Sequence, residues 1–221
     1  MKATFATIAC LILAGILSAV EVGGNNTAVV IQKAKAQSKT GWQLLCVPVN
    51  ELQISGATTE NGIEIATILP PSSFPVGTSV YINNTKAYVL TEQGEDLAWV
   101  KQSSRPDTKL LPGQEFWLKK PDGNYEMPAA TTFCGQDRGL TTITRPRSGS
   151  AGLCKNDSAT PIKISTIVPD DIRKGDQILC VENGKNEYKM YQRGTSKWYL
   201  DGVAVDTDVI APGEAFYYYA K

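Results

Sequence analysis

The sequence predicts an all-β protein of two homologous small antiparallel β-sandwich or barrel domains in tandem after a signal peptide. Two observations support this prediction. The chain of 221 residues contains many short runs of aromatic and β-branched residues, separated by turn-forming residues. Such spacing is typical of small sandwiches and barrels. A set of landmark residues also recurs in the same order about 100 positions later, which indicates a duplicated structural unit.

The N-terminus predicts a signal peptide over residues 1–19. Lys2 is followed by an uncharged apolar stretch, which is the layout of a secretory signal. We expect cleavage after the Leu-Ser-Ala tripeptide that ends at Ala19, and an Ala-Lys-Ala tripeptide ending at Ala36 is a second site. Residues 20–40 are predicted to be a flexible leader, and the mature protein is predicted to be secreted or held at the cell surface.

Three other roles for this N-terminal segment stay open. One is a lipoprotein attached through Cys10, although the usual leucine of such a site is missing. Another is a type IV pilin, whose glutamate should come sooner after processing than Glu21 does. The third is an uncleaved anchor, because the apolar run approaches the roughly 18–20 residues that span a bilayer. We expect no membrane span in the mature chain.

The internal repeat is defined by segments that match between the two parts of the chain. Their offsets drift only where loops are expected, so the chain is predicted to hold β domain 1 (41–126), a linker strand (127–148) and β domain 2 (149–221). The matched segments are Leu45-Cys46 with Leu153-Cys154, Thr67–Pro70 with Thr166–Pro169, Gly77–Ile82 with Gly175–Cys180, Ala87–Leu90 with Glu187–Met190, Trp99–Lys101 with Trp198–Leu200, and Leu111–Trp117 with Ala211–Tyr217.

Each copy is predicted to form several short strands. Turn-forming dipeptides such as Asn183-Gly184 separate them, and this dipeptide favours a tight hairpin because both residues tolerate positive φ. The segments Ile63–Pro70 and Ile162–Pro169 are each expected to hold a strand or a short helical turn. The other predicted strands are Ser79–Ile82, Ala87–Thr91, Leu97–Lys101 and Glu115–Lys119, followed by Gln177–Glu182, Glu187–Arg193, Lys197–Leu200 and Ala215–Ala220.

The pattern resembles the tandem β repeats of secreted proteins of uncharacterised function from environmental bacteria. The resemblance covers residues 41–221 and implies the architecture and export, but it supplies no catalytic residue. The second copy departs from the pattern, because it opens without a Trp and has Tyr217 where the first has Trp117. The motifs that carry the resemblance are Gly41-Trp42-Gln43-Leu44, Gly175-Asp176-Gln177-Ile178, Tyr188 with Trp198, and Pro112 to Trp117.

Composition excludes several classes of function. The chain has 22 Lys and Arg, 22 Asp and Glu, and no histidine. Zero net charge argues against a nucleic-acid partner. The missing histidine excludes Ser-His-Asp and Cys-His catalysis and any His-containing zinc site. We expect no enzyme activity, no metal and no cofactor. A glycosidase needing only two carboxylates is a third and weaker candidate, and Asp206-Thr207-Asp208 is expected to be a solvated loop rather than a Ca²⁺ site.

The cysteines predict two disulfides. Cys10 leaves with the signal peptide, and an even four then stay in an exported chain with no C-x-x-C motif. Cys154 and Cys180 are expected to form a bond within the second domain, while a bond between Cys46 and Cys134 is expected to tie the linker segment back to the first strand of the first domain. Four buried thiols are the alternative.

The candidate binding residues are aromatic. Trp42, Trp117, Tyr199, Tyr217 and Tyr219 are candidates for a platform that stacks on a sugar ring or a flat partner surface. The competing interpretation places the repeated aromatic residues, Trp99 and Trp198 above all, in the domain cores. The consecutive tyrosines 217–219 predict either a last strand packed on both faces or an adhesive sheet edge.

The sequence therefore predicts an exported, non-catalytic structural or adhesive protein of the cell surface, the extracellular matrix or an extracellular assembly. Its expected partners are itself or other surface proteins. The alternative is a carbohydrate-binding module that uses exposed Trp and Tyr platforms, with a glycan as its ligand.

Overall fold

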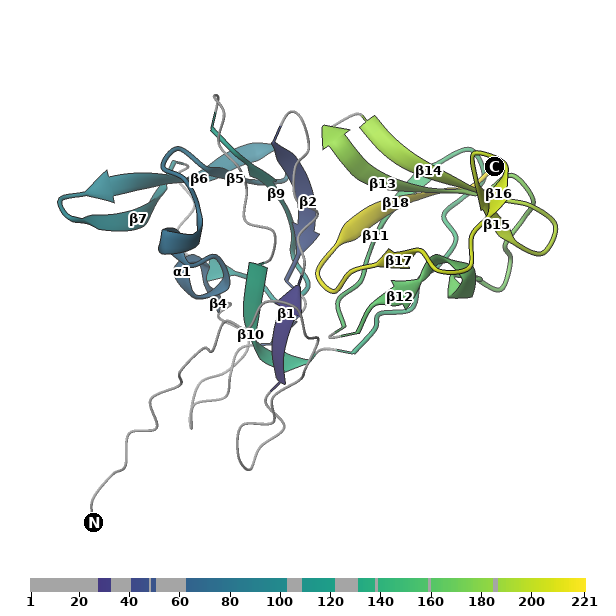
Figure 1. Cartoon of the computed structure of the whole chain (residues 1–221), viewed down its shortest axis with the longest axis horizontal. Helices are drawn as coiled ribbons and strands as arrows, with labels where there is room; N and C mark the ends of the chain where they lie inside the picture. The colour runs from purple at the N-terminus through teal and green to yellow at the C-terminus, as the bar shows by residue number, and fades with distance from the viewer. Residues whose placement is uncertain are drawn as a thin grey trace, which may run out of the picture.

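The computed structural model confirms an all-β protein in which every pairing of strands is antiparallel. Two main sheets lie side by side, one from each repeat (Figure 1). The signal peptide predicted over residues 1–19 lies outside the described residues. These are 28–32, 41–47, 49–50, 63–102, 109–121, 131–137, 139–158, 160–184 and 187–221.

The first half of the molecule is built on a five-stranded sheet, which a two-stranded ribbon and helical turns cover on one face. The sheet order is β2 (Trp42–Cys46), β9 (Glu115–Lys119), β5 (Ser79–Ile82), β6 (Thr85–Gln93) and β7 (Asp96–Lys101). The covering elements are β4 (Ile63–Glu64), β8 (Lys109–Leu110), α1 (Ile65–Ile68) and η2 (Pro71–Ser73).

The second half repeats this plan around a six-stranded sheet. Its order is β11 (Ala151–Lys155), β18 (Ala215–Tyr219), β13 (Gln177–Gly184), β14 (Glu187–Arg193), β15 (Trp198–Leu200) and β16 (Val203–Ala204). The cover consists of β12 (Ile162–Lys163), β17 (Val209–Ile210) and η3 (Ile164–Thr166). Both segments expected to hold a strand or a helical turn hold one of each, a two-residue strand followed by a turn of helix.

A third, small sheet combines a strand from the predicted linker segment with two short strands that the sequence did not predict. In it, β10 (Thr131–Asp137) lies between β1 (Ala28–Gln32) and β3 (Val49–Asn50). β1 falls in the segment predicted as a flexible leader, so that prediction is wrong for residues 28–32. The physical reason is the Ala-Val-Val-Ile run, which favours a strand. The five residues of β1 pair with residues 131–135 of β10.

Each half has its own apolar core between the main sheet and its cover. In the first half, Leu45, Val80 and Phe116 alternate inward from neighbouring strands, and Leu69 packs on them from the cover. The second core uses the same positions, including Phe216. The core location predicted for Trp198 is confirmed because it is fully buried.

Trp99 and Trp198 join each cover to its sheet in the same way. Trp99 packs against the first core, and its Nε1 donates to the Leu69 carbonyl over 2.7 Å. Trp198 Nε1 donates to the Ile167 carbonyl over 2.9 Å. The recurring tryptophan is therefore explained by the packing of each half, since it fastens the helical turn to the sheet.

Strand pairing corrects the predicted alignment of the two copies. Leu45 pairs with Phe116, and Cys154 pairs with Phe216. Cys154 is therefore equivalent to Leu45, one position away from the match that the sequence suggested. Further along, Val80 pairs with Tyr88 while Ile178 pairs with Tyr191, which makes Tyr191 the counterpart of Tyr88.

The predicted Cys154–Cys180 disulfide is wrong, and the predicted Cys46–Cys134 bond involves a cysteine whose side chain is not described. Cys46, Cys154 and Cys180 are thiols in the structure, and the side chain of Cys134 lies outside the described residues. Cys154 is on β11 and Cys180 is on β13, with β18 between them. Two strand spacings separate their Cα atoms by roughly 10 Å, whereas a disulfide requires less than about 7 Å.

Two general properties of the described residues bear on function. No helix among them is long and apolar enough to cross a membrane. Within the same part of the chain, no group of three or more His, Cys, Asp and Glu residues is placed to hold a metal ion.

Candidate functional site

The two halves meet through a cluster of side chains, which we call the interface cluster. In the first half, Leu44 and Trp117 project from the face of the sheet opposite the core, and they are only 4% and 7% exposed. Val181 and Ala215 face them from the second half. Four aromatic residues complete the interface cluster: Trp42, Tyr81, Tyr188 and Tyr217.

Polar contacts reinforce the meeting of the two halves. The Cys46 amide donates to the Gly213 carbonyl over 2.7 Å. Lys155, which is the counterpart of Cys46, sends its Nζ to the Gly113 carbonyl and to Glu115 Oε1. Equivalent positions therefore contact equivalent carbonyls across the interface, so its centre has approximate two-fold symmetry.

A difference in hairpin length breaks this symmetry. Twelve residues connect Ile178 to Tyr191 in the second half, but only seven connect Val80 to Tyr88 in the first. The longer β13–β14 hairpin reaches the first half, where the end of β13 lies next to β2 (Figure 1). It covers Leu44 there. The short β5–β6 hairpin turns at residues 83–84. Among the described residues, it does not pack beside β11 in the way that β13 packs beside β2.

The outer face of the second sheet consequently displays an apolar row, which we call the open row. It runs across four strands through Leu153, Tyr217, Leu179 and Met190, each paired with its neighbour in register. Leu153 is 43% exposed and Met190 is 46% exposed. Tyr217 belongs both to the open row and to the interface cluster. The open row therefore extends an existing interface across the exposed surface of the sheet.

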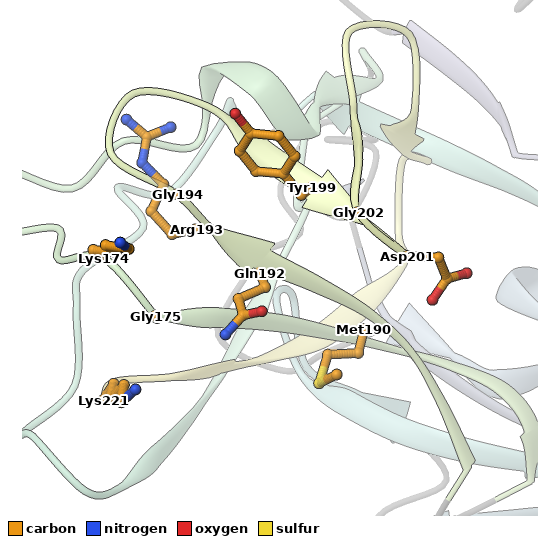
Figure 2. A pocket seen from close by; sticks show the side chains of 10 residues that line it. All are labelled: Lys174, Gly175, Met190, Gln192, Arg193, Gly194, Tyr199, Asp201, Gly202 and Lys221. Carbon is orange, nitrogen blue, oxygen red and sulfur yellow. The ribbon is translucent and has the colours of Figure 1, made fainter.

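The next row along the same face is more polar and borders a groove. It contains Ala151, Tyr219, Gln177, Gln192 and Tyr199 in register. The groove has a volume of about 440 Å³ and is open to solvent. Figure 2 shows Gln192 near its centre, with Tyr199 and Lys221 on opposite sides of Gln192 in that view. Its lining residues are Lys174, Gly175, Met190, Gln192, Arg193, Gly194, Tyr199, Asp201, Gly202 and Lys221.

A buried charged network fixes the backbone at one end of this groove. Asp176 is fully buried and accepts two hydrogen bonds from the Arg145 guanidinium, from Nε over 2.7 Å and from Nη2 over 3.0 Å. It also accepts from the Lys221 amide and from the Tyr218 hydroxyl, both over 3.0 Å. Arg145 Nη2 donates in turn to the Lys221 carbonyl. Lys221 is thus held through both of its backbone polar groups.

This network sets the ionisation of its members. Burial by itself would raise the pKa of Asp176, but the hydrogen bonds from Arg145 and from backbone amides lower it to about 2. Burial raises the pKa of Tyr218, and its hydrogen bond to the Asp176 carboxylate raises it further. The pKa of the Arg145 guanidinium is raised by its hydrogen bond to Asp176. The pair is therefore ionised throughout the physiological pH range.

Glycines position two groove side chains. The Tyr199 ring lies against Gly194, where an added Cβ would come within 2.5 Å of the ring. The Lys221 side chain lies on Gly175, whose φ is +94° and whose added Cβ would be 2.5 Å from Lys221 Cδ. A side chain at either position would clash with these groups, so glycine is required at both. The Tyr199 ring and the Lys221 side chain therefore pack directly on the backbone of Gly194 and Gly175.

The predicted binding residues do not form a single platform. Trp42 and Trp117 lie in the interface cluster, and Trp117 is too buried to stack on a ligand. Tyr217 is half-buried beside them, and burial raises the pKa of its hydroxyl. Only Tyr199 and Tyr219 lie on the open part of the second sheet, and of these only Tyr199 lines the groove. The predicted tryptophan platform is therefore wrong for Trp117.

The adhesive-edge interpretation of the last strand is also wrong. β18 lies inside the sheet, between β11 and β13, so both of its sides are hydrogen-bonded. Tyr218 points into the core and Tyr217 points toward the first half. The strand is therefore packed on its core face at Tyr218 and against the first half at Tyr217, whereas Tyr219 lies on the open part of the sheet.

The buried carboxylates of the described residues are engaged in structural contacts. Asp157 accepts from the amide and the hydroxyl of Thr141. Glu214 accepts from the Ala211 amide. Asp208, part of the acidic loop considered for Ca²⁺, is half-buried and bonded to Lys189 Nζ and to the Tyr191 hydroxyl. These bonds tie each of the three carboxylates to neighbouring segments of the fold.

Sequence reasoning missed Lys174, Gln192 and Lys221, and the Arg145–Asp176 pair that supports the groove. Asp176 did belong to the repeated Gly-x-x-Ile/Val pattern, but the first copy has Thr78 at that position. The charge of Asp176, at a position where the first copy has an uncharged residue, was the signal that could have revealed the buried ion pair. Comparison of the chain with protein-family models, curated proteins and solved structures finds no match, so the resemblance to secreted β-repeat proteins stays a prediction.

Proposed function

We propose that the chain is an exported, non-catalytic structural or adhesive protein that associates with further copies of itself through the open row. The observation that supports this is the open row, in which Leu153 and Met190 are exposed on either side of the half-buried Tyr217 and Leu179. The exposed face of an antiparallel sheet is ordinarily polar. Single exposed apolar residues need no explanation, but a contiguous exposed patch marks an interaction surface.

The choice of a second copy as partner follows from the interface cluster. The counterparts of Leu153, Tyr217 and Leu179 in the first half are Leu44, Trp117 and Tyr81. Those three residues are covered by the second half of the same chain. The protein therefore already packs one row of this type against another part of itself. The open row is continuous with that interface, because Tyr217 belongs to both.

Sedimentation velocity across a range of protein concentrations tests self-association. The informative variant is Leu153→Gln with Met190→Gln, because both side chains are exposed and neither lies in a core. We expect association of the wild type to be weakened at least about tenfold. The matched control is Val203→Gln, which alters an exposed residue on β16, away from the open row. A monomer at all concentrations, or an unchanged double variant, would refute the proposal.

A second candidate function is carbohydrate binding at the groove. It is favoured by Tyr199, whose ring is fixed on Gly194 beside the exposed amide of Gln192. A rigid aromatic ring next to a few polar groups is a common arrangement in small-ligand sites. Nuclear magnetic resonance titration with neutral and acidic oligosaccharides tests it, and binding without any shift in the Tyr199 or Gln192 signals would argue against the groove.

A further inference from the structure

We propose that the groove binds an acidic carbohydrate, one whose sugar rings carry carboxylate groups. The inference rests on the second candidate function and names its ligand class. It comes from the two lysines that flank the groove, which belong neither to the open row nor to a core.

Unpaired positive charge flanks the groove. Within the part of the chain that the structure describes, neither the Lys174 nor the Lys221 ammonium has a carboxylate within ion-pair distance. The third cationic residue, Arg193, is buried and its guanidinium lies over the Trp198 ring at 5.8 Å. Two ammonium groups are thus available at the groove, while the arginine is already engaged.

The Lys221 side chain is preorganised at the groove. Lys221 is fixed at its amide by Asp176 and at its carbonyl by Arg145. Its side chain folds back over Gly175, so that Nζ lies 3.4 Å from the position an added Cβ would take. The ammonium is therefore held at the groove rather than extended into solvent, which lowers the entropy that a bound anion would have to remove.

The other groove residues favour a sugar over other anions. Tyr199 offers one ring face to the groove, and the Gln192 amide can both donate to and accept from hydroxyl groups. Asp201, at a turn with φ of 51°, adds a carboxylate that can accept hydrogen bonds from sugar hydroxyls. Hydroxyl groups, a flat apolar ring face and a negative charge occur together in a uronic acid.

Isothermal titration calorimetry with tetragalacturonate tests the proposal directly. The matched probe is its methyl ester, which has the same rings without the charge. We expect the tetragalacturonate to bind at least about tenfold more tightly than the ester, and its affinity to fall as salt is added. We also expect Lys221→Gln and Lys174→Gln to weaken binding about three- to tenfold each, and Tyr199→Ala to weaken both probes.

The control variant is Lys163→Gln, which removes an exposed charge on β12 and should leave binding unchanged. Equal binding of acid and ester would overturn the acidic specificity and leave carbohydrate binding intact. No binding of either would overturn both. Tighter binding of guanosine monophosphate than of tetragalacturonate would assign the groove to nucleotides instead. The single variant Leu153→Gln alters the open row without touching the groove lining, so it should bind tetragalacturonate normally, which separates this test from that of self-association.

Discussion

The two halves share one strand plan but stabilise it differently. In the first half, Leu118 and Thr78 occupy positions next to the core where the second half has Tyr218 and Asp176. The Thr78 hydroxyl needs only the Pro75 carbonyl as its acceptor. Asp176 requires a full set of donors, among them Arg145 from the segment that joins the two halves. The same backbone therefore tolerates either an apolar contact or a buried ion pair.

The outer faces of the two sheets differ for a separate reason. The chain covers the outer row of the first sheet with its own second half, whereas the equivalent row of the second sheet stays open. Two features accompany this difference: the longer β13–β14 hairpin packs beside β2, and exposed Lys86 stands in the first half where the open row has Met190. Duplication followed by a change in one hairpin can thus turn an internal contact surface into an external one.

The largest expected effect comes from truncating the covered row. Trp117→Ala should lower the free energy of unfolding by about 3–5 kcal/mol, because a buried aromatic side chain leaves a cavity between the halves. Tyr217→Ala, at the equivalent but half-open position, should cost about 1–2 kcal/mol. Urea unfolding followed by fluorescence and circular dichroism gives both values. Equal losses of unfolding free energy in the two variants would mean that Trp117 and Tyr217 are buried to the same extent, and would contradict the difference between the two sheets.

The buried ion pair should rank next. Asp176→Asn should cost about 2–4 kcal/mol because it leaves the Arg145 charge without its carboxylate. Thr78→Val in the first half should cost no more than about 1 kcal/mol, since one neutral hydrogen bond is lost. Asp171→Asn is a control near the same arginine, and its exposed side chain should make it almost neutral. A neutral Asp176→Asn variant would contradict the difference drawn between the halves.

The same carboxylate predicts a pH dependence. The pKa of Asp176 is about 2 when folded, below the value of about 3.9 for an unfolded chain. Its contribution to stability is therefore complete above about pH 4 and is lost as the pH falls toward 2. The stability difference between the wild type and Asp176→Asn should shrink over that interval, as thermal unfolding at stepped pH would show. A constant difference would exclude the ionised carboxylate as its cause.

The smallest effect is expected from reduction. Because Cys154 and Cys180 are thiols, dithiothreitol should change the unfolding midpoint by less than the equivalent of about 0.5 kcal/mol, against the roughly 2–4 kcal/mol of a disulfide. Burial raises the pKa of the Cys154 thiol to about 11, so its alkylation at pH 7.5 should be slow. Mass spectrometry after iodoacetamide treatment, with and without prior unfolding, measures both the number of free thiols and the rate at which Cys154 is alkylated. Loss of two hydrogens per pair of cysteines would contradict the thiol assignment.

Local patterns predicted much of the fold. The Pro-Gly turn before Phe116 and Phe216, the strands that follow it and the core tryptophans all depend on residues close together in the sequence. The positions of Trp117 and β18 did not follow, because burial between halves and strand order depend on contacts distant along the chain. Neither cysteine pairing nor the equivalence of Tyr88 with Tyr191 was accessible without the register, because a longer hairpin shifts the alignment between landmarks.

The candidate site was harder to predict than the fold. Tyr199 was selected for its ring, but its position beside a groove depends on Gly194 and on pairing with Gln192. Lys221 gave no signal at all as a terminal lysine in the sequence. Its orientation comes from Asp176 and Arg145, which lie 45 and 76 positions away along the chain.

The central position of β18 has a mechanical consequence. A strand bonded to antiparallel neighbours on both sides, as β18 is to β11 and β13, resists a pull along its own axis in shear, because all of its cross-strand bonds carry the load together. The tether from Arg145 to the Lys221 carbonyl and to Asp176 adds a brace at the point where such a force would enter the sheet. A pull applied at Lys221 would therefore load β18 in shear against both neighbours and would not peel it from the sheet.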